Sequence, residues 1–380
     1  MRSASIAGRT FPITVLISIL ISIAGWSPRV LAVEPREWTV MVYLCADNNL
    51  DELGLDNLQE MADAGSTANR SIVALLDRFN APATEYVIEG RKAVVLRERG
   101  ELNMGDPAVL TGFVQDTIAR YPAQHYALIL FNHGTGWRNR SDGWRGIAYD
   151  DSSGDHLSTA ELQTVTADIA RHLGRNLDLL GFDACLMQMI EVAYAVRQSV
   201  DHVVGSEELE PQYGYPYDSI LKALISGMSP GDLARTIVRK YENFYSTRSS
   251  KTAYRPVKNQ RDPEGTTQSA IKCSRLNDLR ASLDAVCAEL MKGDHIDRVQ
   301  QAIARAQRFC TSTHADLGDF LVALKQADNP APELDVAIDT ALRTLNETVL
   351  ANAVTQNDAS GDWGGESRRW VRQRPVRAFR

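Results

Sequence analysis

The sequence predicts an α/β protein, a three-layer α/β/α sandwich with a mostly parallel central sheet and a helical C-terminal extension. Three observations predict this fold. Apolar, β-rich runs such as residues 37–47 lack polar alternation, as strands buried on both faces do. Helical patterns separate these runs along the first 225 residues, which is typical of parallel strands covered by helices. Beyond residue 226 the pattern becomes mainly helical.

The elements of the first half follow one another in a regular order. Strands are predicted at residues 37–47, 71–79, 126–132, 177–183 and 202–208, with a hairpin at 85–98 that turns around Glu89-Gly90. Helices are predicted between them at residues 48–65, 106–121, 158–173 and 186–198. Ser158 and Glu161 have the spacing of a capping box at the start of their helix.

The second half and the long connections are less regular. Residues 134–156 form a loop rich in Gly, Arg and Asp, and residues 246–268 form a polar loop. Further helices are predicted at residues 218–226, 230–246, 276–292, 295–308, 317–326 and 332–352. We therefore expect an α/β core at residues 33–225, a mainly helical part at 226–357 that completes or flanks it, and an arginine-rich tail at 358–380 that is disordered or altered.

The N-terminus has the pattern of an export signal. Arg2 and Arg9 precede an apolar stretch at residues 11–26, and small residues at 30–32 suit signal peptidase. We therefore expect a signal peptide at residues 1–32 and an exported protein that is periplasmic, extracellular or at the cell surface. The alternative is an uncleaved anchor, for which the stretch is short. After removal of the signal no stable membrane span is expected.

The net charge and the cysteine content argue against two classes of protein, nucleic-acid-binding proteins and proteins with a zinc cluster. The formal net charge of -7 argues against a nucleic-acid-binding protein, which would need a basic surface. The five cysteines include no CxxC pair, so a zinc cluster is not expected. In an exported chain an odd number leaves at least one thiol without an intramolecular partner.

Two residues follow predicted strand ends and could act together. His133 and Cys185 each lie just past a strand, and sites in such folds form at the carboxyl ends of strands. A predicted helix starting near Leu186 would stabilise the Cys185 thiolate, and His133 could act as acid and base. The N–H groups of Gly134 and Cys185 could form an oxyanion hole. The alternative is a buried thiol and an unrelated loop histidine.

A resemblance strengthens this interpretation. The blocks VMVYLCADNNLD, HYALILFNHGTGW, IAYDDSSGDHLSTAEL, LDLLGFDACLMQMIEVAYAV and VVGSEELEPQYGYPY, with a weaker echo in ADLGDFLVAL, resemble successive blocks of the clostripain family of cysteine peptidases. The resemblance implies a caspase-like fold and a dyad formed by His133 and Cys185. It also implies cleavage of peptide or protein substrates after Arg or Lys.

Preference for a basic residue requires a carboxylate partner in a pocket. The resemblance points to Asp183, two residues before Cys185 and on the same side of an extended segment. Alternatively, Asp183 caps the following helix. A second carboxylate could come from Glu207, Glu208 or Glu210, among which the sequence does not choose.

The proposed chemistry requires no cofactor. A dependence on calcium is left open, because some members of the family depend on it. Asp150, Asp151 and Asp155 form an acidic cluster that could bind calcium, although their spacing is not that of an EF-hand and suits turn residues better. The nature of any metal site is therefore left unknown.

Many family members cut themselves between the histidine and the cysteine. Here that loop contains Arg138, Arg140 and Arg145, so activation by autolysis is a hypothesis. The arginine-rich tail replaces an apolar segment usual in the family, which could impair activity. We expect an exported endopeptidase. Two alternatives remain: a non-catalytic peptide-binding relative, or a Cys/His hydrolase or transpeptidase acting on another amide.

Overall fold

A computed structural model describes residue 1 and residues 35–137, 146–247, 265–309, 314–328 and 330–356. The chain divides into the units Met1–Glu34 and Pro35–Arg380, and the account below concerns the second. The expected signal peptide, Arg138, Arg140, Arg145 and the arginine-rich tail lie outside the described residues. In the described part no helix is long and apolar enough to cross a membrane.

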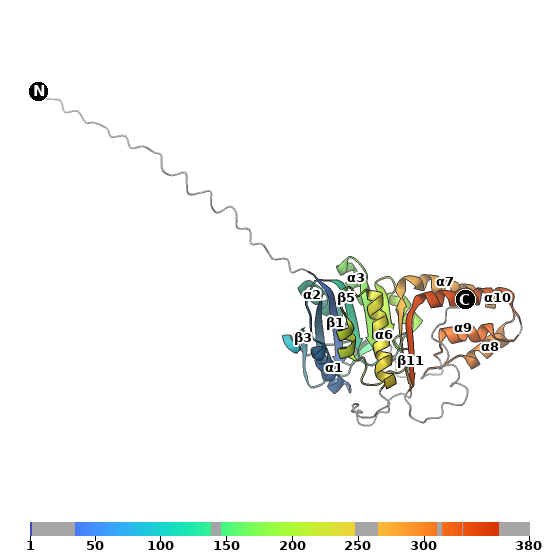
Figure 1. The fold of residues 1–380 in the computed structure, drawn as a ribbon, viewed down its shortest axis with the longest axis horizontal. Helices are drawn as coiled ribbons and strands as arrows, with labels where there is room; N and C mark the ends of the chain where they lie inside the picture. Colours follow the sequence, from blue (N-terminus) through green and yellow to red (C-terminus); the bar gives the residue numbers. More distant parts are fainter. Residues whose placement is uncertain (2–34, 138–145, 248–264, 310–313, 329, 357–380) are drawn as a thin grey trace. The chain divides into compact units, whose positions relative to one another are not determined.

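A nine-stranded sheet forms the centre of the fold (Figure 1), in the order β11-β10-β9-β8-β5-β1-β2-β3-β4. The parallel strands are β1 (Arg36–Ala46), β2 (Arg70–Arg78), β5 (Ala123–Phe131), β8 (Leu177–Asp183) and β9 (Val200–Gly205). The antiparallel edges are β3 (Ala81–Glu89) and β4 (Lys92–Gly100) on one side, and β10 (Gly265–Lys272) and β11 (Val349–Gln356) on the other. The sheet is thus mixed, with a parallel centre as expected.

Continuous apolar sequence explains the parallel centre. All seven residues of β8 are buried, as are Thr39 to Ala46 of β1. A strand of this kind needs cover on both faces of the sheet. Side chains alternate across the sheet, so Met41 and Tyr43 belong to one apolar cluster and Val42 and Leu44 to the other.

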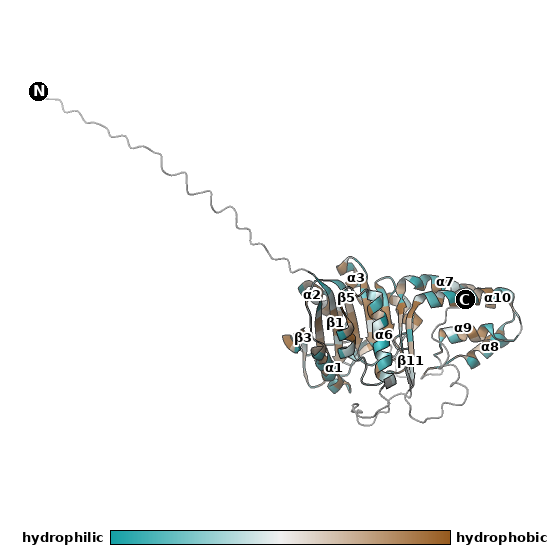
Figure 2. Ribbon diagram, viewed as in Figure 1, coloured by the Kyte–Doolittle hydropathy of each residue, from teal (hydrophilic) through white to brown (hydrophobic). Residues whose placement is uncertain are grey.

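Helices provide this cover. One face carries α2 (Pro107–Arg120), α3 (Thr159–Leu173) and α4 (Ile190–Val196), and the other carries α1 (Asp51–Ala64), α5 (Tyr217–Ala223) and α6 (Pro230–Thr247). In Figure 2 α6 has both hydrophobic and hydrophilic residues, as a helix covering a sheet requires. The predicted three-layer α/β/α architecture is confirmed. The capping box of Ser158 and Glu161 is also present at the start of α3.

The C-terminal part combines helices with strands. Helices α7 (Leu276–Leu290), α8 (Ile296–Arg305), α9 (Leu317–Lys325) and α10 (Pro332–Thr348) share a separate apolar cluster that includes Leu321, Leu324 and Ile338. A short 3-10 turn, Cys273–Arg275, precedes α7. Figure 1 shows α8, α9 and α10 beyond the β11 edge of the sheet.

Two predicted boundaries in this part are wrong. The helix predicted at 332–352 ends at Thr348, and β11 follows without a break. The polar loop predicted at 246–268 contains the start of β10. These two strands pair with each other, and β10 pairs with β9, so long-range pairing rather than local pattern fixes them as strands.

The predicted loop at 134–156 also contains regular structure. Strands β6 (Ile147–Asp150) and β7 (Asp155–Leu157) form a small antiparallel sheet. An isolated bridge joins Ile147 to Gly134, and Asp151 N–H donates to Asp47 O at 2.9 Å. The described residues 146–151 of this loop are therefore held against the carboxyl ends of β5 and β1.

Candidate functional site

His133 and Cys185 occupy equivalent places at the ends of neighbouring strands. Strands β5 and β8 are parallel, and Phe131 is paired with Asp183 at their carboxyl ends. The Asn132 N–H continues this pairing by donating to Asp183 O at 3.3 Å. His133 and Cys185 each come two residues after the last pair, so the strand register places both residues at the same edge of the sheet.

Gly134 allows the two strand-end loops to touch. A Cβ atom on Gly134 would lie 2.2 Å from the backbone oxygen of Cys185 and 3.1 Å from Cβ of Ala184. No side chain fits at the first of these distances. The bridge to the 146–147 segment uses the Thr135 N–H, which donates to Gly146 O at 3.0 Å, and not the Gly134 N–H. The backbone of Gly134 therefore faces Cys185 directly.

The helix predicted to start near Leu186 begins later. Residues 184–188 form an irregular turn, and α4 starts at Ile190. Leu186 has φ of 63°, a left-handed conformation that side chains disfavour. The proposed stabilisation of a Cys185 thiolate by the helix dipole is therefore wrong, because that effect is confined to the first turn of a helix.

A backbone N–H group, rather than the N-terminus of a helix, contacts the Cys185 sulfur. The Glu210 N–H donates to Cys185 Sγ at 3.2 Å. Such a donor stabilises the thiolate, which is the stronger acceptor. The segment that supplies it is fixed, since Leu186 N–H donates to Glu208 O at 3.2 Å and Gln188 N–H donates to Ser206 O at 3.0 Å.

Asn49 contacts His133 and was not identified from the sequence. The Nε2 atom of His133 lies 2.7 Å from Oδ1 of Asn49. Asn49 follows β1, which lies next to β5 in the sheet. The strand-end rule that selected His133 and Cys185 also applies to the ADNNLD segment after β1, and this was the available signal.

The other described cysteines differ from Cys185. Cys45, Cys185, Cys273 and Cys287 are all free thiols, and Cys310 lies outside the described residues. Burial raises the pKa of Cys45 well above its usual value and that of Cys273 to about 12. Buried thiols of this kind stay protonated and unreactive. Cys185 is half-buried and lies beside a histidine loop and a backbone donor.

Asp183 is the last residue of β8 and is buried. Its Oδ1 accepts from Tyr215 N–H at 2.9 Å, and its Oδ2 accepts from Tyr217 OH at 2.8 Å. Gly214, at φ of 65°, allows this approach, because a Cβ there would lie 2.4 Å from Oδ1 of Asp183. These bonds come from the 214–217 loop, so the alternative that Asp183 caps a following helix is wrong.

A second buried carboxyl group lies with Asp183. Among the three glutamates left open by the sequence, Glu210 interacts electrostatically with Asp183. Glu207 instead accepts from Ser269 Oγ at 2.9 Å, and Glu208 accepts from the Leu209 N–H at 2.7 Å. Burial raises the pKa of Asp183 to about 7, and burial together with the Asp183 charge raises the pKa of Glu210 well above its usual value.

Glu210 and its partner Gln268 each have one buried polar atom that is left unsatisfied. Oε1 of Glu210 accepts from Gln268 Nε2 at 3.1 Å, but Oε2 is buried with no hydrogen-bond partner among the described residues. The same holds for Gln268 Oε1. Buried polar atoms are normally hydrogen-bonded, so this group is suited to receive a polar or cationic ligand.

The acidic residues near 150 have structural partners. Asp150 accepts from Met104 N–H at 2.9 Å and from Ser153 N–H at 2.7 Å. Asp155 accepts from Asn103 Nδ2 at 2.7 Å, which lowers its pKa. Asp151 is exposed. Asp150 and Asp155 thus behave as the turn residues that their spacing suits better.

Comparison with known proteins identifies the family. The model of the clostripain family matches residues 42–357, which is most of the chain. The chain belongs to the clostripain family. Clostripain of Hathewaya histolytica is 33% identical over 223 residues, covering 50% of this chain. The match spans only 42% of that relative's length.

Solved structures of clostripain-family (C11) proteases share the fold. A secreted C11 cysteine protease from Bacteroides thetaiotaomicron, solved with an irreversible peptide inhibitor, has a TM-score of 0.67 at 22% identity and covers 84% of this chain and 85% of its own. An inactive zymogen C11 protease from Parabacteroides distasonis has a TM-score of 0.63 at 22% identity, covering 84% of each chain.

Proposed function

We propose that this chain is an exported cysteine endopeptidase that hydrolyses peptide bonds after Arg or Lys. The observation that supports the proposal is the register of β5 and β8, which pairs Phe131 with Asp183, each two residues before a member of the proposed dyad. Asp183 is the last residue of β8, and it forms a buried carboxyl pair with Glu210. This pair supports a preference for substrates with a basic residue before the scissile bond.

In the proposed mechanism Cys185 is the nucleophile. His133 takes the thiol proton, and the sulfur attacks the carbonyl carbon of the substrate to form a carbon–sulfur bond. The N–H groups of Gly134 and Cys185 stabilise the oxyanion of the tetrahedral intermediate. When the carbon–nitrogen bond breaks, His133 donates its proton to the leaving amine. Water, activated by His133, then hydrolyses the thioester and restores the thiol. No metal takes part in these steps.

The carboxyl pair accounts for the preference for a basic residue. Without substrate the pair keeps a proton, because burial disfavours two neighbouring negative charges. A guanidinium or ammonium group replaces this proton and offers donors to the unsatisfied Glu210 Oε2. A neutral side chain brings no charge to replace the proton, so the pair stays protonated and gains no ion pair with the substrate.

The decisive experiment compares the chain with its Cys185→Ala variant on fluorogenic peptides. The peptides differ only in the residue before the scissile bond: Arg, Lys, Asp, Asn or Leu. We expect cleavage after Arg or Lys, loss of cleavage in Cys185→Ala, and full activity in Cys287→Ala, which removes an exposed thiol elsewhere. Absence of cleavage by the folded wild-type chain would favour a non-catalytic relative. Cleavage of other amides only would favour a hydrolase or transpeptidase of different specificity.

Self-activation is a further part of the proposal. Arg138, Arg140 and Arg145 lie between the described residues Trp137 and Gly146 and match the proposed specificity. A protein with the same fold is described as an inactive zymogen, which supports an activation step. Mass spectrometry of active protein should show cleavage after one of these arginines, and the Cys185→Ala chain should stay intact. An active preparation with all three bonds uncut would contradict self-activation.

A further inference from the structure

Two non-glycine residues in the described part of the chain have a left-handed backbone, and both lie next to residues of the candidate site. Leu186, with φ of 63°, directly follows Cys185. Ala148, with φ of 60°, lies in β6, which is bridged to Gly134. Side chains disfavour this backbone conformation, so it persists only where the surrounding contacts enforce it.

Ala148 lies at a bulge in β6. This strand has one more residue than β7 between the two cross-strand pairs that end at Leu157 and Asp155. A glycine usually occupies the left-handed position of such a bulge, because it has no Cβ atom. Tyr149, the residue after Ala148, is not among the pairs of β6 with β7. Its N–H group and carbonyl oxygen bond to side chains instead.

The side chain of Asn132 holds the backbone of Tyr149. Oδ1 of Asn132 accepts from Tyr149 N–H at 2.7 Å. Nδ2 of Asn132 donates to Tyr149 O at 3.1 Å and to Cys45 O at 2.5 Å. Both amide hydrogens are thus used, and a flipped amide would place its oxygen against two carbonyl oxygens. The Asn132 side chain is therefore fixed in one orientation, and the residue is only 4% exposed.

The backbone of Asn132 connects the same contacts to the strand that leads to Cys185. Its N–H donates to the oxygen of Asp183, which ends β8, at 3.3 Å. Asn132 thus joins the ends of β1, β6 and β8, and His133 is the next residue in the chain. Any shift of Asn132 would move the start of the histidine loop relative to the nucleophile.

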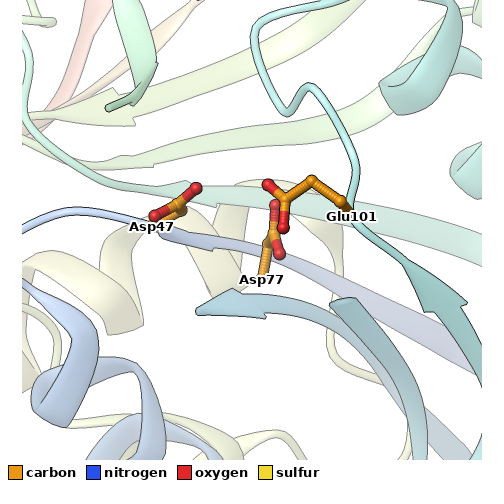
Figure 3. Close-up of side chains that lie close together, drawn as sticks. All are labelled: Asp47, Asp77 and Glu101. Atoms are coloured by element: carbon orange, nitrogen blue, oxygen red, sulfur yellow. The ribbon is translucent and has the colours of Figure 1, made fainter. Parts of the chain in front are cut away.

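Two further donors hold the Tyr149 carbonyl oxygen. Asn48 Nδ2 donates to it at 2.8 Å, and Cys45 Sγ donates at 3.2 Å. Burial raises the pKa of Cys45, and so do the charges of nearby carboxylates, so the thiol keeps the proton that it donates. Figure 3 shows three carboxylates that point toward one another at this edge of the sheet: Asp47, Asp77 and Glu101. A carbonyl oxygen has two lone pairs, so Tyr149 O stays satisfied when one of three donors is removed.

We propose that Asn132 is a positioning residue for His133, and that the bulge at Ala148 presents the Tyr149 backbone to it. This inference rests on the proposed peptidase function, in which His133 serves Cys185. Asn49 contacts the imidazole itself, whereas Asn132 acts through the main chain before it. Without the Asn132 side chain, the histidine loop loses its side-chain bonds to β1 and β6.

The test measures how strongly His133 activates the Cys185 thiol and requires no peptide cleavage. The full chain carrying Cys287→Ala, which removes an exposed thiol, is alkylated with iodoacetamide at pH 6 and pH 9. Peptide mapping counts the adduct at Cys185 alone. A thiol with an imidazole partner keeps reactivity at pH 6 that an isolated thiol lacks. We expect the ratio of the two rates to fall about tenfold or more in His133→Ala, and about threefold or more in Asn132→Ala.

A double-mutant cycle separates positioning from stability. In the His133→Ala chain, Asn132→Ala should leave the ratio unchanged, because no imidazole remains to be positioned. Ser199→Ala removes a buried hydroxyl at the opposite, amino edge of the sheet. It is the control, and we expect it to lower the unfolding temperature but keep the ratio. Ala148→Gly should also keep the ratio, because glycine adopts this backbone without strain.

An unchanged ratio in folded Asn132→Ala, or a loss of equal size with and without His133, would overturn the proposal. If Asn132→Ala does not fold, Asn132→Ser replaces it in the cycle, because the short hydroxyl cannot reach both strand ends. On peptides, Asn132→Ala should lower kcat about 10- to 100-fold with little change in KM. The expected ratios without cleavage of any peptide would support this inference and count against the endopeptidase proposal.

Discussion

The Nε2 atom of His133 lies 2.7 Å from the Oδ1 atom of Asn49. An amide oxygen only accepts hydrogen bonds, so Nε2 carries the proton and Nδ1 is the basic nitrogen of the neutral ring. The bond joins the ends of β1 and β5, neighbouring strands in the sheet. Asn49 therefore fixes both the orientation and the tautomer of the proposed catalytic histidine.

Asn49→Ala should lower kcat by about 10- to 100-fold with little change in KM, because the ring loses the partner that holds Nδ1 as the base. Asn49→Asp should retain activity but shift the acid limb of the pH–rate profile upward, since a carboxylate raises the pKa of a neighbouring histidine. Asn69→Ala, at an exposed turn, is the control. Unchanged kcat and pH profile in both Asn49 variants would exclude a positioning role.

Gly134→Ala should nearly abolish peptide cleavage, because a Cβ 2.2 Å from Cys185 O forces the two strand-end loops apart. Displacements of about 1 Å at a reacting group can cost about 100-fold in rate. Gly112→Ala on α2, where a Cβ meets nothing within 4 Å, should keep full activity and stabilise the helix by about 0.5–1 kcal/mol. Steady-state kinetics and denaturant unfolding of both variants distinguish the outcomes. An active Gly134→Ala enzyme would contradict the close approach.

Glu210→Gln should reduce kcat/KM for Arg peptides by about 100-fold while changing that for Leu peptides little, because the substrate cation loses one carboxylate. Glu208→Gln is the matched control two residues away, and we expect it to keep the preference. The comparison requires kcat/KM for both peptides with all three enzymes. Equal losses on Arg and Leu peptides would indicate a general structural effect of Glu210.

Asp183→Asn should change how stability depends on pH. A carboxyl group with a pKa of about 7 in the folded chain and about 3.9 when unfolded binds more protons in the folded state between these values. Its contribution to the free energy of unfolding is therefore fully present below pH 4 and falls by at most about 1.4 kcal/mol per pH unit as the pH rises through 7.

Asparagine at position 183 removes this ionisation. The difference in unfolding temperature, Asp183→Asn minus its parent, should therefore increase from pH 4 to pH 8, measured in the Cys185→Ala background at constant ionic strength. A difference that stays constant with pH, or that falls, would show that the Asp183 carboxyl is not held protonated in the folded chain.

The local sequence was sufficient to predict the parallel strands at the centre of the fold. Unbroken apolar runs located β1, β2, β5, β8 and β9, and strand ends located His133 and Cys185, because a parallel sheet collects such ends at one edge. The resemblance to clostripain blocks added the family, which the family model confirms. The residues at these strand ends could be found because each follows a strong local pattern.

The features that could not be predicted from the sequence depend on contacts between segments far apart in the chain. Glu210 could not be separated from Glu207 and Glu208, because only the folded loop decides which one meets Asp183. The turn after Cys185 resembles the start of a helix in its composition, but hydrogen bonds to Ser206 and Glu208 hold it open. Asp47, Asp77 and Glu101 lie at three strand ends that are separated along the chain by α1 and by strands β3 and β4, so no spacing in the chain reveals the group.

The order of the strands along the chain has a consequence for biosynthesis. Cys185 follows β8, but the Glu210 carboxyl gains its partner Gln268 only after β10 has been made. A ribosome must therefore release the chain past residue 268 before this contact, and with it the proposed pocket, can assemble. During synthesis the emerging chain therefore carries Cys185 before the hydrogen bond between Gln268 and Glu210 can form.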